Sequence, residues 1–143
     1  RKFRNMLDLG TGSGVLAIAV AKRTAATVLA TDIDPVAVDV ARANSRTNEV
    51  ASAISLATAA GFHSAVFGST GPFDLIVANI LARPLMKMAH PIRTHLAPGG
   101  SVILSGILAC QRWKVLAAFS DQGLFHRHTI WRDGWVTLHL GAG

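Results

Sequence analysis

Asp8-Leu9-Gly10-Thr11-Gly12-Ser13-Gly14 is the stretch of this chain that decides its fold. It lies between an apolar run that suits a strand, Phe3–Leu9, and an alanine-rich run that suits a helix, Val15–Arg23. Glycines let the backbone turn sharply between two such elements, and they let a ligand approach without a Cβ in the way. The stretch, which we call the glycine loop, therefore predicts a strand–loop–helix unit with a ligand at the loop.

The rest of the chain alternates short apolar runs with helical stretches, which is typical of βαβ units around a mostly parallel sheet. Asp34 and Pro35 suit the N-cap and first residue of a helix, and Pro91 is expected to kink or split a later one. Asp133-Gly134, between two β-rich runs, predicts a hairpin. The expected strands are Phe3–Leu9, Thr27–Thr31, Ala53–Leu56, Phe73–Ala78, Ser101–Ser105, Phe125–Trp131 and Trp135–Leu140, and the expected helices are Val15–Arg23, Pro35–Asn48, Pro84–Leu96 and Cys110–Gln122. The prediction is an α/β fold, a doubly wound, mostly parallel, Rossmann-like sheet of seven strands with a C-terminal antiparallel hairpin.

The spacing of the glycine loop limits the kind of ligand. It is Gly-x-Gly-x-Gly, whereas the loop that seats a pyrophosphate on a helix N-terminus has the spacing Gly-x-Gly-x-x-Gly. The Gly-Lys-Ser/Thr of a phosphate-binding loop is also missing. Asp8 adds negative charge, which favours a cationic ligand over a pyrophosphate. A nucleoside without phosphates is therefore expected, and the alternative is a tight turn that binds nothing.

Three residues at strand ends are candidates for the rest of the site. Asp32 follows the loop by about twenty residues, where a carboxylate can accept hydrogen bonds from both ribose hydroxyls. Helix capping is its other possible role, but Asp34 already serves there. Ile33 could lie against an adenine face or equally belong to the core. Asn79 ends the fourth strand, and its amide carbonyl can orient an amine nucleophile, unless it is only a turn residue.

Composition sets broad limits on function. Half of the 143 residues are hydrophobic, enough for the core of one domain. The net charge of +6 comes from scattered basic residues, which favours a generally basic surface over contact with RNA or a ribonucleoprotein. The single cysteine, Cys110, excludes an internal disulfide and suits a reducing compartment, so we expect the cytoplasm. No apolar run approaches the roughly 18 residues of a membrane span.

Other chemistries find little support. His126 and His128 share a strand face, but no third ligand stands at a suitable spacing, so no metal site is expected. Ser13 and Ser105 have no recognisable base partner, so a hydrolase triad is not expected. The chain starts at Arg1, without a methionine and almost directly on a strand. We therefore expect a piece of a longer chain.

Four segments together resemble the bacterial ribosomal protein L11 methyltransferase family: residues 8–19, 31–38, 77–85 and 104–108. The first two segments are shared by many class I methyltransferases, whose version of the doubly wound fold ends in the antiparallel hairpin predicted above. The segments Asn79-Ile80-Leu81-Ala82-Arg83-Pro84-Leu85 and Leu104-Ser105-Gly106-Ile107-Leu108 are far more specific. The resemblance covers essentially the whole chain.

The resemblance implies S-adenosylmethionine as the cofactor and a ribosomal protein of the large subunit as the substrate, trimethylated at lysine side chains and at its N-terminal amine. It implies one catalytic domain over residues 1–143, and we expect a monomer. Asn79 is the expected catalytic residue. The expected cofactor-binding residues are Asp8, Gly10, Thr11, Gly12, Gly14, Asp32, Ile33, Gly61 and Asn79.

The chain departs from the family pattern in ways that bear on activity. The family's N-terminal substrate-recognition domain, and a threonine-containing segment before the first strand, are not in this sequence. Ala25 and Glu49 stand where the family often has glycine, and Glu49 in a left-handed conformation would cost about 1 kcal/mol unless Asn48 takes that position. We therefore expect weak cofactor binding and no methylation by this chain alone.

Three alternatives stay open from the residues. The first is a methyltransferase that acts on ribosomal or transfer RNA, although the Asn-Pro-Pro-Tyr of base-amine methyltransferases is missing after the fourth strand. The second is a cofactor-binding module without activity. An NAD-dependent oxidoreductase is the least favoured, because the loop spacing does not suit a pyrophosphate.

Overall fold

Seven strands form one sheet in the order β3-β2-β1-β4-β5-β7-β6 in the computed structural model, which describes residues 3–142. Arg1, Lys2 and Gly143, included in the predicted domain limits, lie outside the described residues. Strands β1 to β5 are parallel, and β7 runs antiparallel to both β5 and β6. The predicted fold class is therefore confirmed. The strands are β1 (Asn5–Leu9), β2 (Thr27–Asp32), β3 (Ile54–Thr58), β4 (Phe73–Asn79), β5 (Leu96–Leu108), β6 (Leu124–Arg132) and β7 (Trp135–Ala142).

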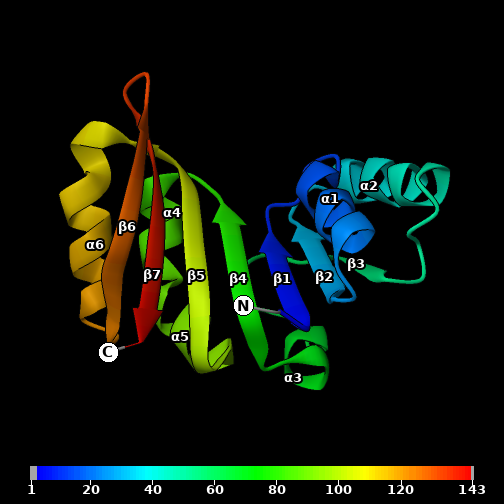
Figure 1. Ribbon diagram of the computed structural model, residues 1–143, viewed down its shortest axis with the longest axis horizontal. Coiled ribbons are helices and arrows are strands. Elements are labelled where there is room, and N and C mark those ends of the chain that lie inside the picture. The colour runs from blue at the N-terminus through cyan, green and yellow to red at the C-terminus, as the bar shows by residue number, and fades with distance from the viewer. Residues whose placement is uncertain (1–2, 143) are drawn as a thin grey trace.

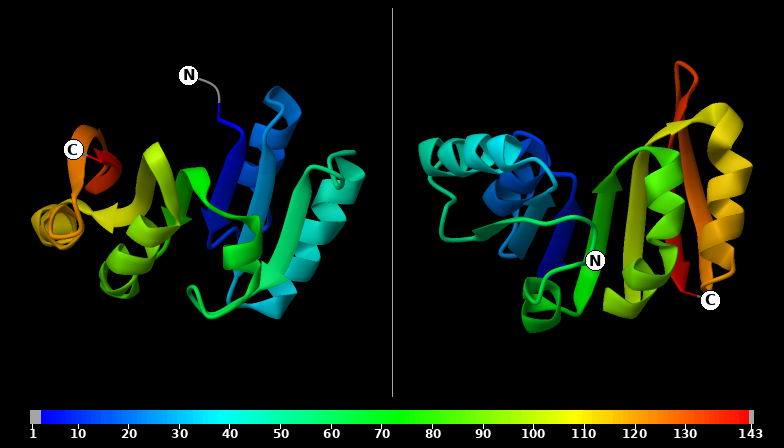
Figure 2. Two further views of the ribbon diagram at one scale, coloured as in Figure 1. Left: turned by 90° about the horizontal axis from the view of Figure 1, so that it is seen from below. Right: turned by 180° about the vertical axis from the view of Figure 1, so that it is seen from behind.

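Helices lie on both faces of the sheet (Figure 1). Two of them, α1 and α2, lie over the half formed by β1, β2 and β3, and Figure 2 shows α4, α5 and α6 on the opposite face, over β4 to β7. The helices are α1 (Val15–Arg23), α2 (Pro35–Thr47), α3 (Val66–Thr70), α4 (Ala82–Lys87), α5 (Ala89–His95) and α6 (Arg112–Ser120), with a 3₁₀ turn at Ala109–Gln111 before α6. Within residues 3–142, none is long and apolar enough to cross a membrane.

The core explains why β4 is apolar at nearly every position. Ile76 and Ala78 belong to the cluster on the side of α4 and α6, while Leu75 and Val77 belong to the cluster on the side of α1. A central parallel strand is buried on both faces, so it carries a continuous apolar run and no polar alternation. Asn79, the first polar residue after that run, consequently stands at the carboxyl edge of the sheet.

The predicted helix 84–96 is split, but not where the proline stands. The break is at Met88, with φ −96° and ψ 5°, between α4 and α5. Pro91 cannot donate a hydrogen bond to the carbonyl of Lys87, and its ring would clash with that group. The chain therefore breaks one turn earlier and restarts, which leaves Pro91 in the first turn of α5, where no N–H is needed.

Other boundaries differ from the prediction for tertiary reasons. β5 extends from Leu96 to Leu108, beyond the predicted strand Ser101–Ser105 at both ends, because Phe73 pairs with Leu96 and Trp135 pairs with Leu108. The helix expected over residues 110–122 is shorter, Arg112–Ser120, and follows the 3₁₀ turn. Helix α3 was not predicted. The hairpin is as expected, with positive φ at both Asp133 (49°) and Gly134 (81°).

Candidate functional site

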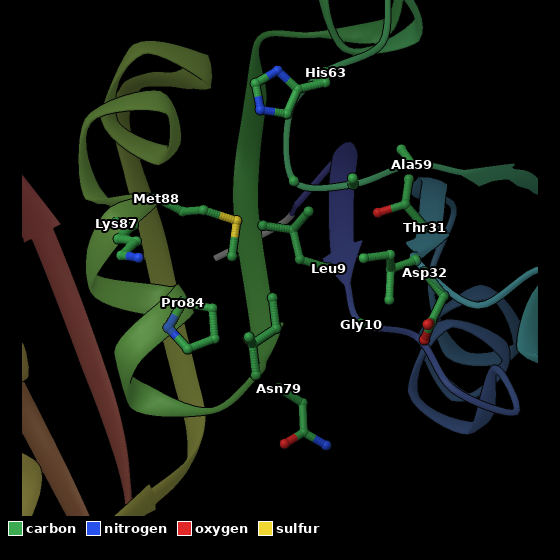
Figure 3. Close-up of a pocket in the computed structure, with 14 residues that line it drawn as sticks. Leu9, Gly10, Thr31, Asp32, Ala59, His63, Asn79, Pro84, Lys87 and Met88 are labelled. Carbon is green, nitrogen blue, oxygen red and sulfur yellow. The ribbon is translucent and has the colours of Figure 1, made fainter.

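A cavity of about 540 Å³ lies at the carboxyl edge of the sheet, a volume within the usual range for small-molecule sites. Figure 3 shows it between the ends of β1, β2 and β4 on one side and the α4–α5 junction on the other. Its lining comes from five segments of the chain: Leu9, Gly10, Thr31, Asp32, Ile33, Ala59, Ala60, Gly61, His63, Asn79, Ile80, Pro84, Lys87 and Met88. Of the predicted site residues, the structure brings together Gly10, Asp32, Ile33, Gly61 and Asn79 around this one cavity.

The three glycines of the glycine loop all have positive φ, but for different physical reasons. A Cβ on Gly10 would lie 2.9 Å from the backbone oxygen of Asn79, so this glycine lets β1 and β4 converge. A Cβ on Gly14 would lie 3.0 Å from the Cβ of Ala41, so this one lets α1 pack against α2. A Cβ on Gly12 would meet nothing within 4 Å. Of the three glycines, only Gly12 therefore has its Cβ position free of protein atoms, and close approach of a ligand there stays a prediction.

Hydrogen bonds tie the glycine loop to the end of β2. The amides of Gly10 and Thr11 both donate to the carbonyl oxygen of Thr31, each at 2.9 Å. The amide of Gly12 donates to Asp32 Oδ2 at 2.9 Å. Because these amides are held by β2, the loop and the acid at the end of β2 form one rigid unit beside the cavity.

Asp32 is oriented before any ligand arrives. Its Oδ2 accepts from Gly12 and its Oδ1 accepts from the amide of Asp34 at 3.0 Å. A carboxylate oxygen has two lone pairs, so each oxygen keeps one for another donor. Asp34 accepts from the amide of Val36 at 2.9 Å as the N-cap of α2, which confirms the separate capping role predicted for it. Asp32 is thus left to face the cavity.

Asp8 lies beneath the glycine loop, with only 2 % of its surface exposed. Its Oδ2 accepts from the hydroxyl of Thr11 at 2.8 Å. Burial raises the pKa of Asp8 from 3.8 to about 6; the Thr11 hydrogen bond opposes this rise and the charge of Asp32 adds to it. The cavity lining includes none of Asp8, Thr11, Gly12 and Gly14, so contact of these four with a cofactor stays a prediction.

Ile33 and Gly61, both predicted to bind the cofactor, line the cavity, and their contact with a cofactor stays a prediction. Ile33 is 72 % exposed, which excludes the core role considered for it. Gly61, on the loop after β3, has φ +59°, and a Cβ there would lie 3.5 Å from Met88 Sδ. The opposite wall, made by Pro84, Lys87 and Met88, was not predicted from the sequence, and it lies at the junction where the predicted helix breaks.

Asn79 lies at the end of β4, exposed and directed away from the sheet (Figure 3). It pairs with Ser105 of β5 through the backbone register. Within residues 3–142 no hydrogen bond holds its side chain. Its amide is thus available to a ligand or a substrate at the carboxyl edge of the sheet.

The sheet order, the glycine loop and the acid at the end of β2 define the fold of the class I methyltransferases. A solved RNA methyltransferase from Salinibacter ruber, in complex with S-adenosyl-L-homocysteine, superimposes with a TM-score of 0.75 at 21% identity, over 96% of this chain and 80% of that one. The family model described as "Ribosomal protein L11 methyltransferase (PrmA)" matches residues 1–142. The chain therefore belongs to the ribosomal protein L11 methyltransferase family.

Individual proteins similar to this chain carry the name of the same family. The ribosomal protein L11 methyltransferase of Allorhizobium ampelinum is 68% identical over 140 residues, which are 98% of this chain and 48% of that protein. A solved ribosomal protein L11 methylase from Lactobacillus delbrueckii subsp. bulgaricus is 34% identical, with a TM-score of 0.87 over 98% of this chain and 70% of that one. The chain thus spans about half the length of the curated relatives it matches.

Proposed function

We propose that the chain binds S-adenosylmethionine in the cavity between Asp32 and Asn79, and that the site transfers its methyl group to amino groups of ribosomal protein L11. The acceptors are lysine side chains and the N-terminal amine. The observation that carries the proposal is the carboxylate of Asp32, fixed by two backbone amides and facing the cavity with a free lone pair on each oxygen. Membership of the family supports the acceptor.

The described residues fit such a cofactor. The free lone pairs of Asp32 can accept the two ribose hydroxyls. Ile33 and Met88 offer apolar surface on opposite walls for a flat base. No protein atom lies within 4 Å of a Cβ placed on Gly12, so the loop leaves room there for the part of the cofactor beyond the ribose and the base.

The chemistry divides between the cofactor and the chain. Bound S-adenosylmethionine supplies a methyl group already activated by its sulfonium. Asn79 accepts a hydrogen bond from the acceptor amine through its amide carbonyl and so orients the nitrogen lone pair. Alignment of this kind can account for several of the roughly 7–11 kcal/mol that proximity contributes to catalysis.

The acceptor amine must be neutral to attack. A free lysine has a pKa of about 10.4, so at neutral pH it carries a proton that blocks its lone pair. Removing an ammonium from water disfavours its charged form and lowers its pKa, so that its proton can pass to water before the nitrogen attacks. The largely apolar rim beside Asn79, including Ile80 and Pro84, provides such an environment.

Calorimetric titration of the 143-residue chain with S-adenosylhomocysteine tests the cofactor site. We expect weak but measurable binding, and we expect Asp32→Ala to lower the affinity by about ten- to a hundredfold, as loss of charge-assisted hydrogen bonds predicts. Asp34→Ala is the matched control, because it removes a neighbouring carboxylate that only caps α2, and it should stay within about threefold of the unaltered chain. Equal loss in both variants, or in neither, would contradict the role of Asp32.

A test of the methyl acceptor requires a longer protein than this chain. A chimera in which residues 1–142 replace the matching segment of the Allorhizobium ampelinum relative supplies the remaining half of that protein. Incubated with labelled S-adenosylmethionine and whole ribosomes, the chimera should label ribosomal protein L11, and Asn79→Ala should lower turnover by about a hundredfold. Label in the ribosomal RNA instead would show that the acceptor is wrong.

A further inference from the structure

Strand β5 contains a bulge beside Asn79. Leu104 pairs with Leu138 of β7 and Ile107 pairs with Val136, so two residues of β5 stand opposite the single Thr137 between them. The second of the two, Gly106, has φ +77°. A bulge with a left-handed residue favours glycine, and bulges commonly occur next to active sites, where they redirect a side chain.

The bulge brings the backbone of Gly106 against the amide of Asn79. A Cβ on Gly106 would lie 2.8 Å from Asn79 Oδ1, a separation that real Cβ contacts essentially never show. The other nearby atoms are backbone atoms of Ile80, at 3.6 and 3.8 Å, which are ordinary contacts. The amide oxygen of Asn79 therefore occupies the place that any other residue at position 106 would fill.

Nothing else described in the structure holds this amide. Among residues 3–142, no hydrogen bond to the Asn79 side chain is formed. The terminal amide of an asparagine turns easily about its last bond, because that torsion is broad. A side chain at position 106 would therefore be accommodated most readily by displacing the amide of Asn79, while the strands stayed in place.

We propose that Gly106 is a positioning residue, which sets the direction of the Asn79 carbonyl by leaving room for it at the β5 bulge. The inference rests on the proposed function, in which this carbonyl orients the acceptor amine. It assigns a role to the glycine of the Leu104–Leu108 segment. That segment carried much of the family resemblance without any part in the chemistry.

Two single glycine substitutions distinguish an effect on the position of the Asn79 amide from an effect of backbone strain alone. Gly106→Ala places a Cβ at φ +77° against Asn79, while Gly99→Ala places one at φ +73° with nothing within 4 Å. Both glycines have a positive φ of nearly the same size, so the two variants impose similar left-handed strain. In nuclear magnetic resonance spectra of the 143-residue chain, we expect the side-chain NH₂ signals of Asn79 to move in Gly106→Ala and to stay in Gly99→Ala. Unmoved signals in Gly106→Ala would overturn the proposal.

A second measurement covers the case in which Gly106→Ala is too unstable for spectra. If the Cβ clashes with the Asn79 amide, the shift of the urea midpoint caused by Gly106→Ala should be smaller in an Asn79→Ala background, where the obstacle is gone. An equal shift in both backgrounds would mean that strain alone explains the glycine, and the proposal would fail. Neither measurement involves the cofactor, so a failure of cofactor binding leaves the two results interpretable.

Kinetics of the chimera connect the geometry to the reaction. Gly106→Ala should lower kcat by about a hundredfold, as a displacement near 1 Å can do, while the KM for S-adenosylmethionine stays within about threefold. Gly99→Ala should leave both constants close to those of the parent. A purely structural defect would instead reduce the amount of folded protein in both variants.

Discussion

Asp8 connects the pH of the solution to the stability of the glycine loop. Its pKa is about 6 in the folded chain because of burial, against 3.8 for an ordinary aspartate. Between these values the folded state binds more protons than the unfolded state, so the free energy of unfolding falls as the pH rises from about 4 to 6. Above pH 6 the carboxylate is charged in both states, and the full loss, on the order of 3 kcal/mol, persists.

Asp8→Asn should remove this pH dependence, because an amide can still accept from Thr11 but carries no charge. We expect its stability relative to the unaltered chain to be greater at pH 7.5 than at pH 4.5, by about 2 kcal/mol. Urea unfolding at the two pH values measures the difference. Asp121→Asn, at an exposed carboxyl, is the control, and the difference between its free energy of unfolding and that of the parent should be the same at both pH values. A pH-independent difference for Asp8→Asn would show that its carboxyl titrates normally.

At the scale of elements, the end of α2 is strained. Glu49 has φ 61°, while the preceding Asn48 remains at −90°, so the left-handed position falls on the residue less suited to it. Asparagine tolerates this conformation better than glutamate, but Asn48 N donates to Asn44 O and so continues the helical pattern. The cost anticipated from the sequence for Glu49 is therefore present.

Glu49→Gly should raise the free energy of unfolding by about 0.5–1 kcal/mol, since relief of left-handed strain outweighs the added freedom of the unfolded chain. Ala25→Gly is the matched control. Ala25 also stands where the family often has glycine, but it has no positive φ, so its replacement should lower stability slightly. Thermal unfolding of both variants decides the point, and a stabilising Ala25→Gly would contradict this account.

Some helices and turns could be predicted from local sequence patterns alone. Asp34 with Pro35 began a helix as expected, and Asp133 with Gly134 formed the hairpin, because the backbone preferences of these residues act within a few positions. The split that Pro91 predicts falls three residues earlier, at Met88, and α3, whose N-cap Ala65 makes no side-chain hydrogen bond, was not predicted. Of the cavity, the β-strand ends were predictable from sequence and the α4–α5 wall was not.

The whole molecule depends on its last strand. β7 lies between β5 and β6, and its inward residues Val136, Leu138 and Leu140 belong to the larger core cluster. The chain therefore cannot complete the core until its C-terminal residues are in place. Removal of a buried side chain from β7 should therefore destabilise the whole fold.

Leu138→Ala should destabilise the fold by about 2–5 kcal/mol, because this side chain is fully buried and its removal leaves a cavity. Ile130→Ala, on the neighbouring strand β6 but 56 % exposed, should change stability by no more than about 0.5 kcal/mol. Urea unfolding followed by circular dichroism measures both. Similar losses in the two variants would show that the hairpin contributes through its β-strand pairing and not through burial.

The sequence by itself determined the βαβ order, the glycine loop, the acid after β2 and the hairpin. Each of these follows from periodicity or backbone sterics over a short stretch, which neighbouring residues cannot easily override. Only the tertiary structure decided that Asp8 is buried, that Met88 forms a cavity wall, and that Gly106 lies against the amide of Asn79. These features arise where segments far apart in the chain meet, and their distances are set by strand order and helix packing, which no local pattern encodes.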